Sequence, residues 1–151
     1  MHANWKFHHI SIAVKDMNQA VEFYKSLGIG PFPPFIGPSG PVPLANKKLM
    51  GKPSDYSVDI RQAQGGVGQA GFELVEPVEG ETPVKEFLEK KGEGVHHIGF
   101  TVDNLDREAA KMAEKGFRIT QSGETPTARW AYFDTDAVGG VVIELIELTA
   151  E

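Results

Sequence analysis

The sequence predicts an α+β fold built from two repeated modules, and two internal echoes lead to this prediction. The segment Phe7 to Met17, FHHISIAVKDM, is echoed by Val95 to Leu105, VHHIGFTVDNL, at an offset of 88 (97 − 9). The segment Phe72 to Glu76, FELVE, is echoed by Ile143 to Glu147, IELIE, at an offset of 71 (144 − 73). Because the two echoes follow in the same order, the chain holds two copies of one supersecondary unit.

Each half begins with an alternating segment that predicts a strand, and a helix follows it. In the first half Asp16 is the expected helix cap, apolar residues then recur at helical spacing, and Gly28 ends the helix. In the second half Asn104 or Asp103 is the expected cap and Gly116 is the end. Both halves are therefore expected to start with a strand and a helix.

Extended segments after each helix complete the two βαβββ modules. They are expected at 56–64 and 71–76 in the first half and at 117–122, 131–135 and 140–148 in the second. Thr82 and Pro83 predict the start of a short linking helix. The chain is thus expected to be one domain, 1–151, with module one at about 5–80, the linker at about 82–91 and module two at about 93–149. The first half has 17 more residues between its echoes (88 − 71), which we assign to a Pro/Gly-rich loop at 30–53.

Strand phase decides which polar side chains share a face. Side chains alternate along a strand, so only one histidine of each His-His pair can face a given side. His9 shares its face with the small Ser11 and Ala13, and His97 shares its face with Gly99 and Thr101. Glu73 and Glu144 face the side opposite to their apolar neighbours. The adjacent His8 and His96 lie on the packing faces, where we expect ordinary satisfied polar residues.

Taken singly, each of these residues has an ordinary structural explanation, since a strand-start His is usually a satisfied polar group and a Glu in a last strand usually faces water. Their joint placement favours a shared cation, because a carboxylate facing a dry interior without a partner is costly. Two imidazoles and two carboxylates suit one divalent metal ion: Zn, Co, Ni, Mn or Fe. His9, Glu73, His97 and Glu144 are the predicted ligands.

The amino-acid composition excludes several classes of protein. The 151 residues are 40% hydrophobic and carry a formal net charge of −6, which argues against a nucleic-acid or membrane-surface protein and leaves a small-molecule partner by elimination. The chain has no cysteine, so disulfides and thiolate chemistry are excluded. No signal-like or membrane-length apolar run is found, and we expect a cytoplasmic protein.

The stretch Glu81 to Ile98, together with the ending VVIEL at 141–145, resembles the vicinal-oxygen-chelate superfamily, and within it methylmalonyl-CoA epimerases and glyoxalase-like members. The superfamily also includes extradiol dioxygenases and bleomycin-resistance proteins. The resemblance implies a curved mixed sheet around a metal-binding cleft. It places the metal ligands on His9, His97 and Glu144, with Glu73 as the fourth, and it implies a homodimer.

The function implied is a metal-dependent isomerase or epimerase that abstracts a proton beside a carbonyl or thioester, with Glu144 as the base and Glu73 or Asp59 as a second acid/base. An acyl-CoA or another carbonyl compound is the expected substrate. The match weakens at Phe133-Asp134-Thr135-Asp136, where epimerases tend to carry Phe-x-His-Pro-Lys.

Three alternatives stay open. One is a glyoxalase I-type lyase, which would need basic residues for glutathione. Another is an extradiol-type dioxygenase, against which a fourth ligand at Glu73 counts. The last is a non-catalytic small-molecule binding or resistance protein. Candidate basic residues are Arg61, Arg118 and Arg129, and a separate lysine cluster, Lys47, Lys48 and Lys52, could meet a phosphate-bearing tail.

Overall fold

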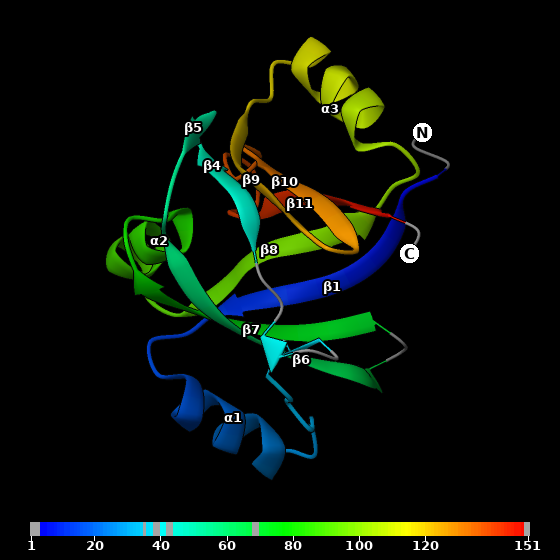
Figure 1. The fold of residues 1–151 in the computed structure, drawn as a ribbon. Helices are drawn as coiled ribbons and strands as arrows, with labels where there is room; N and C mark the ends of the chain where they lie inside the picture. The colour runs from blue at the N-terminus through cyan, green and yellow to red at the C-terminus, as the bar shows by residue number, and fades with distance from the viewer. Residues whose placement is uncertain (1–3, 35, 38–39, 42–43, 68–69, 150–151) are drawn as a thin grey trace. The chain divides into compact units, whose positions relative to one another are not determined.

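The computed structural model describes residues 4–34, 36–37, 40–41, 44–67 and 70–149 (Figure 1). The chain divides into two compact units. Unit one comprises 1–8, 43–55 and 97–151, and unit two comprises 9–42 and 56–96.

Unit two holds a small mixed sheet and two helices. Strand β1 (Lys6–Ala13), which enters this unit at His9, pairs in parallel with β7 (Ala70–Glu79), and β7 pairs antiparallel with β6 (Ser57–Val67). Helix α1 (Met17–Ser26) packs on one face, where Val14, Met17 and Leu74 are buried. Helix α2 (Pro83–Lys91) packs on the other face through Val84 and Leu88. A two-stranded hairpin, β2 (Ile36–Gly37) and β3 (Gly40–Pro41), completes the unit.

Unit one holds a larger sheet with the strand order β5-β4-β9-β10-β11-β8. Its members are β4 (Ala45–Leu49), β5 (Lys52–Pro53), β8 (Gly94–Thr101, which enters this unit at His97), β9 (Ile119–Thr125), β10 (Ala128–Phe133) and β11 (Val142–Leu148). Strands β8 and β11 are parallel, and the other neighbours are antiparallel. Helix α3 (Leu105–Glu114) packs on one face of this sheet (Figure 1), where Leu105, Met112 and Leu145 are buried.

The internal repeat extends to individual hydrogen bonds. Asp16 caps α1 by accepting from the backbone N–H of Gln19, and Asn104 caps α3 by accepting from the N–H of Arg107. In each module a glutamate on the last strand also accepts a hydrogen bond from the backbone N–H of the first helical residue. Met17 donates to Glu76 at 2.8 Å, and Leu105 donates to Glu147 at 2.7 Å. These contacts fall at the same offsets, 88 and 71, that relate the two sequence echoes.

The predicted α+β class and the three predicted helices are confirmed, and Asn104 rather than Asp103 is the cap. Gly28 and Gly116 follow their helices with φ of 85° and 89°, which only glycine adopts without strain. His96 lies on the packing face, as expected: it is almost fully buried, and its ring makes a T-shaped contact with Phe87 at 5.3 Å between centroids.

The stretch at 30–53 differs from the expected loop. Residues 45–53 form β4 and β5, and β4 pairs with β9 of the second module. The lysine-rich sequence of β4 lacks an apolar alternation, so its strand conformation comes from hydrogen bonds to the open edge of β9. Residues 35, 38–39 and 42–43 of this stretch lie outside the described part.

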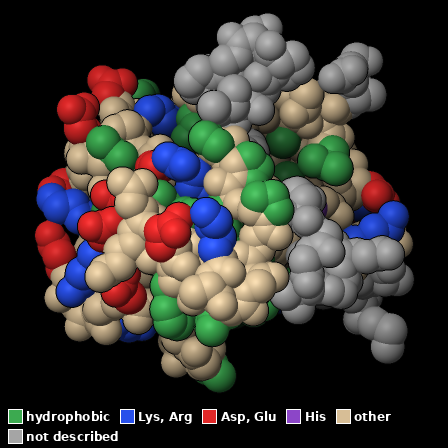
Figure 2. Space-filling view, turned by 90° about the horizontal axis from the view of Figure 1, so that it is seen from below, with side chains coloured by type: hydrophobic (Ala, Val, Ile, Leu, Met, Phe, Trp, Pro, Cys, Tyr) green, Lys and Arg blue, Asp and Glu red, His purple; other side chains and the backbone are tan. Residues whose placement is uncertain are grey.

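Acidic and basic side chains are intermingled on the face shown in Figure 2, with hydrophobic side chains between them. This mixed surface is consistent with the formal net charge of −6, which is not that of a strongly basic protein. Within the ranges that the structure describes, no helix has the length and hydrophobicity needed to cross a bilayer.

Candidate metal centre

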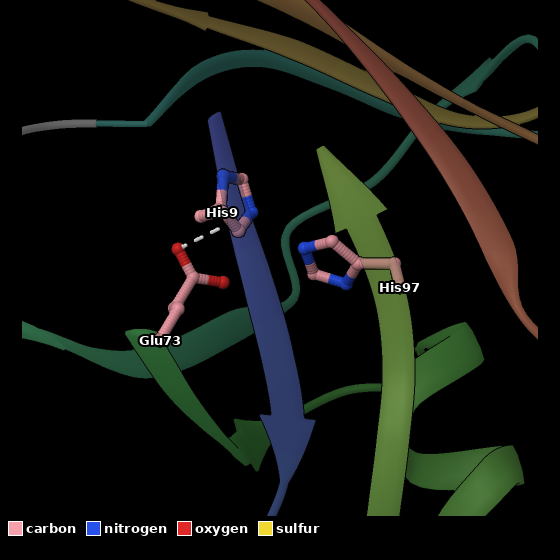
Figure 3. Close-up of side chains that lie close together, drawn as sticks. All are labelled: His9, Glu73 and His97. Atoms are coloured by element: carbon pink, nitrogen blue, oxygen red, sulfur yellow. Dashed lines mark ion pairs between the residues drawn. The ribbon is translucent and has the colours of Figure 1, made fainter. Parts of the chain in front are cut away.

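In unit two, His9 of β1 and Glu73 of β7 face one another on the side of the sheet away from α1 (Figure 3). The His9 Nε2 and the Glu73 Oε2 are 3.8 Å apart, and Ser11 donates a hydrogen bond of 2.7 Å from its Oγ to the Glu73 Oε1. The parallel register sets Ser11 beside Glu73, which explains why these two side chains meet. The relative exposures of His9 and Glu73 are only 3% and 9%.

A glycine makes room for this arrangement. Gly71 lies opposite His9 in the register, and a Cβ built on it would come within 3.1 Å of the His9 Cβ and 2.6 Å of the Gln62 Nε2. A side chain at this position would therefore displace either neighbour. Gln62 lies opposite Glu73 on the adjacent strand, so it shares this face.

In unit one, His97 of β8 and Glu144 of β11 form the equivalent pair. The His97 Nε2 lies 3.4 Å from the Glu144 Oε2, and the two residues are 1% and 5% exposed. Gly99 lies beside Glu144 in the parallel register, and Tyr132 lies opposite Glu144 on β10. The Tyr132 hydroxyl is 3.5 Å from the His97 Nε2.

The two pairs thus occupy equivalent positions with different neighbours. Ser11 donates to Glu73, whereas Gly99, at the corresponding position, has no side chain to donate. Gln62 stands opposite Glu73, and Tyr132 stands opposite Glu144. The repeat therefore duplicates the His–Glu pairs but gives each carboxylate its own hydrogen-bonding environment.

The donor set has the chemistry of a metal site. Each pair presents an imidazole nitrogen and a carboxylate that are almost entirely removed from solvent, at separations longer than a good hydrogen bond. Burying two carboxylates is expensive unless a cation balances them. Nitrogen and oxygen donors of this kind suit borderline divalent ions better than Ca²⁺ or Mg²⁺.

Asp59 lies apart from this face. It stands opposite Glu76 on β7, three residues from Glu73, and strand alternation puts it on the side of the sheet that α1 covers. Its carboxylate receives two hydrogen bonds from Arg61, at 2.9 and 3.1 Å. The register therefore does not bring Asp59 together with His9 and Glu73.

The candidate arginines for a glutathione-type substrate are all engaged by carboxylates. Arg61 binds Asp59, and this hydrogen bond raises the pKa of the arginine. Arg118 binds Asp134, and the hydrogen bond from the backbone N–H of Arg118 is the main cause that lowers the pKa of Asp134. Arg129 binds Asp106 and lies 3.7 Å from Glu147. The three lysines at 47, 48 and 52 lie on β4 and β5 in unit one.

Two contributions to the site do not follow from the sequence alone. Strand alternation identifies Ser11 only as a small neighbour of His9, whereas the structure shows that it donates a hydrogen bond to Glu73. The position of Tyr132 relative to His97 follows from the pairing of β10 with β11, which strand alternation alone does not give. No pattern in the sequence identifies Gln62 or Tyr132 as neighbours of the glutamates, because only the register of the paired strands sets them opposite Glu73 and Glu144.

Comparison with known proteins agrees with this geometry. The sequence profile of the glyoxalase/bleomycin resistance protein/dioxygenase superfamily matches residues 8–133. The chain therefore belongs to this superfamily, as the resemblance of its repeated segments implied.

Among its relatives, the uncharacterized protein YqjC of Bacillus subtilis is 31% identical over 143 residues, which cover 92% of this chain and 89% of that protein. The mitochondrial methylmalonyl-CoA epimerase of Bos taurus is 28% identical over 145 residues, which cover 93% of this chain and 73% of that protein. A Streptomyces coelicolor methylmalonyl-CoA epimerase variant in complex with 2-nitronate-propionyl-CoA superimposes with a TM-score of 0.66 at 25% identity, covering 98% of this chain and 96% of that one.

Proposed function

We propose that the protein is a metal-dependent isomerase that abstracts a proton beside a carbonyl or thioester, as a methylmalonyl-CoA epimerase does. The observation that carries this proposal is the repeated pair of buried His and Glu side chains, His9 with Glu73 and His97 with Glu144. In the proposal, all four side chains hold one divalent ion, of Zn, Co, Ni, Mn or Fe.

Glu144 is the proposed base. Its carboxylate accepts the proton from the carbon next to the carbonyl, and its burial keeps bulk water away from the transfer. A bound divalent ion would supply electrostatic stabilisation of the negative oxygen that forms when the proton leaves. His97, 3.4 Å from Glu144, is then both a ligand and the neighbour that orients the base.

Glu73 is the proposed second acid/base, which epimerisation needs in order to return a proton to the opposite side of the carbon. Asp59, the other candidate, faces α1 and is held by Arg61, so its position favours Glu73 for this role. The hydrogen bond from Ser11 fixes one Glu73 oxygen and leaves the other turned toward His9.

An acyl-CoA is the first substrate class to test, because two of the relatives named above are methylmalonyl-CoA epimerases and one solved epimerase holds methylmalonyl-CoA. The Asp134 to Asp136 turn departs from the epimerase pattern, so other thioesters and 2-oxo acids belong in the same assay. We also propose a homodimer, which light scattering during gel filtration would test.

Metal analysis of the purified protein is the direct test of the site. Wild type is expected to bind about one equivalent of Co²⁺ or Zn²⁺, and Glu73→Gln and His97→Ala are expected to lose most of this affinity. Glu79→Gln, at the exposed end of β7, is the matched control and should bind like wild type. If the wild type takes up no divalent ion after dialysis against each of the five candidates, the proposed function is wrong.

A second experiment tests the reaction itself. Wild type loaded with metal is expected to exchange the proton next to the carbonyl of an acyl-CoA for deuterium, and Glu144→Gln is expected to lose this exchange. Product formation from a hemithioacetal would favour the glyoxalase alternative, and oxygen uptake with a catechol would favour the dioxygenase alternative. A metal-loaded protein with none of these activities would favour the binding protein.

A further inference from the structure

Tyr132 stands at the Nε2 edge of His97 within unit one. Its hydroxyl is 3.5 Å from the His97 Nε2, and the centroids of the two rings are 4.7 Å apart with an angle of 37° between the planes. The register sets Tyr132 directly opposite Glu144 on one side and Gln121 on the other. Tyr132 is therefore on the same face of the sheet as the proposed base.

The ring of Tyr132 is held by its neighbours. Trp130, two residues earlier on β10, lies 5.4 Å away between centroids. The Trp130 ring in turn lies directly over Gly123, where an added Cβ would approach its Cζ2 to 2.4 Å. Trp130 is buried and Tyr132 is half-buried, so the Tyr132 ring packs on a buried neighbour and is itself only partly removed from solvent.

The distance of 3.5 Å between the Tyr132 hydroxyl and the His97 Nε2 limits the role that this contact can have. A good O–H···N hydrogen bond is shorter than 3.5 Å, and a nitrogen whose lone pair binds a cation can no longer accept a proton at all. Glu144, which lies opposite Tyr132 on this face, is a carboxylate with several lone pairs, so it can still accept a hydrogen bond when it serves as a ligand. The Tyr132 hydroxyl is thus a donor group on the same face as the proposed ligands His97 and Glu144.

We propose that Tyr132 is an oxyanion-binding residue: its hydroxyl donates a hydrogen bond to the substrate oxygen that lies beside His97 and becomes negative when the proton is removed. This inference rests on the proposed function, and it narrows the substrate class to compounds with an enolisable carbonyl whose oxygen can reach both His97 and Tyr132. A phenol is a suitable donor because it carries one O–H that can point at a developing negative oxygen.

A purely structural role for Tyr132 makes a different prediction. If the residue only packs against His97, then Tyr132→Phe, which keeps the ring and removes the hydroxyl, should behave like wild type. If it orients His97 as a ligand, the same variant should bind metal more weakly. An oxyanion-binding role leaves the metal affinity unchanged and weakens only the binding of a negatively charged oxygen.

The experiment compares Co²⁺ affinity and oxalate affinity in wild type and Tyr132→Phe. Oxalate is a planar dianion with two adjacent oxygens, like an enolised 2-oxo acid. Isothermal titration would measure Co²⁺ binding to the metal-free protein and then oxalate binding to the Co²⁺ form. We expect equal Co²⁺ affinity and oxalate binding weaker by about tenfold to a hundredfold, as for loss of one hydrogen bond to a charged acceptor.

Tyr24→Phe is the matched control, because Tyr24 stacks in an aromatic cluster of unit two on the side of the sheet that α1 covers. It should bind both Co²⁺ and oxalate like wild type. Equal oxalate binding by wild type and Tyr132→Phe overturns the inference, and so does a loss of Co²⁺ affinity that accounts for the whole change. In either case the proposed function stands, whereas a wild type that binds no metal overturns both.

Discussion

Replacing Glu108 with Gln is expected to destabilise the protein by about 2 kcal/mol at neutral pH, and the structure explains why. Glu108 lies in α3 and is 3% exposed. Its carboxylate accepts hydrogen bonds from the Trp5 indole at 3.0 Å, from Arg107 at 3.0 Å and from Lys111 at 2.9 Å. The Trp5 ring also packs on Phe100 in the core of unit one, so the Glu108 carboxylate links α3 to the residue that precedes β1.

The magnitude follows from the pKa of Glu108. Burial by itself raises this pKa, but the hydrogen bonds from Lys111, Trp5 and Arg107 outweigh burial and lower it from 4.5 to about 2. At about 1.4 kcal/mol per pH unit, the ionised form gains roughly 3 kcal/mol in the folded state. Arg107 and Lys111 are about half exposed, so solvent screening reduces the expected effect to about 2 kcal/mol.

The direction of the pH dependence is fixed by the lowered pKa. Since the folded pKa lies below the unfolded value, the contribution is fully present above pH 4.5 and is lost as the pH falls toward 2. Urea unfolding of wild type and Glu108→Gln at pH 7 and at pH 3 measures it, with Glu114→Gln on the exposed end of α3 as the control. A Glu108→Gln variant as stable as wild type at pH 7, or a difference that grows on acidification, would refute this reasoning.

Three further predictions concern the site and its supports. Ser11→Ala should weaken divalent metal binding about tenfold to a hundredfold by removing the donor that fixes Glu73, and titration with Co²⁺ would show it; unchanged affinity would mean that the hydroxyl does not position the ligand. Gly123→Ala should cost about 1–3 kcal/mol and shift tryptophan fluorescence, because the new methyl group collides with Trp130; an unaltered spectrum and unfolding midpoint would contradict that contact. Glu147→Gln should cost about 1 kcal/mol by weakening the acceptor at the start of α3, measurable by urea unfolding, and a stabilised variant would argue against the capping role.

Strand alternation and internal repetition were enough to predict several features correctly. The caps at Asp16 and Asn104 and the glycine stops depend on contacts within a few residues, and such local geometry is written directly in the sequence. The burial of His9 and Glu73 on one face follows from the period of two, which holds wherever a strand is regular. The metal ion that these residues are proposed to hold stays a prediction.

The sequence does not specify which residues of two neighbouring strands lie opposite one another. Asp59 and Gln62 are both polar residues of β6, and only the register with β7 shows that Gln62 lies opposite Glu73 while Asp59 faces α1. A shift of one residue in that pairing would exchange their faces. Strand β4 is a similar case, since its lysine-rich segment becomes a strand only by pairing with the edge of β9.

The sequence by itself determined the duplicated strand–helix start, the helix ends and the side of each strand on which the His and Glu side chains lie. Those features depend on backbone geometry within one element. Only the tertiary structure decided that Ser11 donates to Glu73, that Asp59 is turned away, and that Tyr132 stands against His97. These contacts depend on the register between paired strands, which no pattern within a single strand specifies.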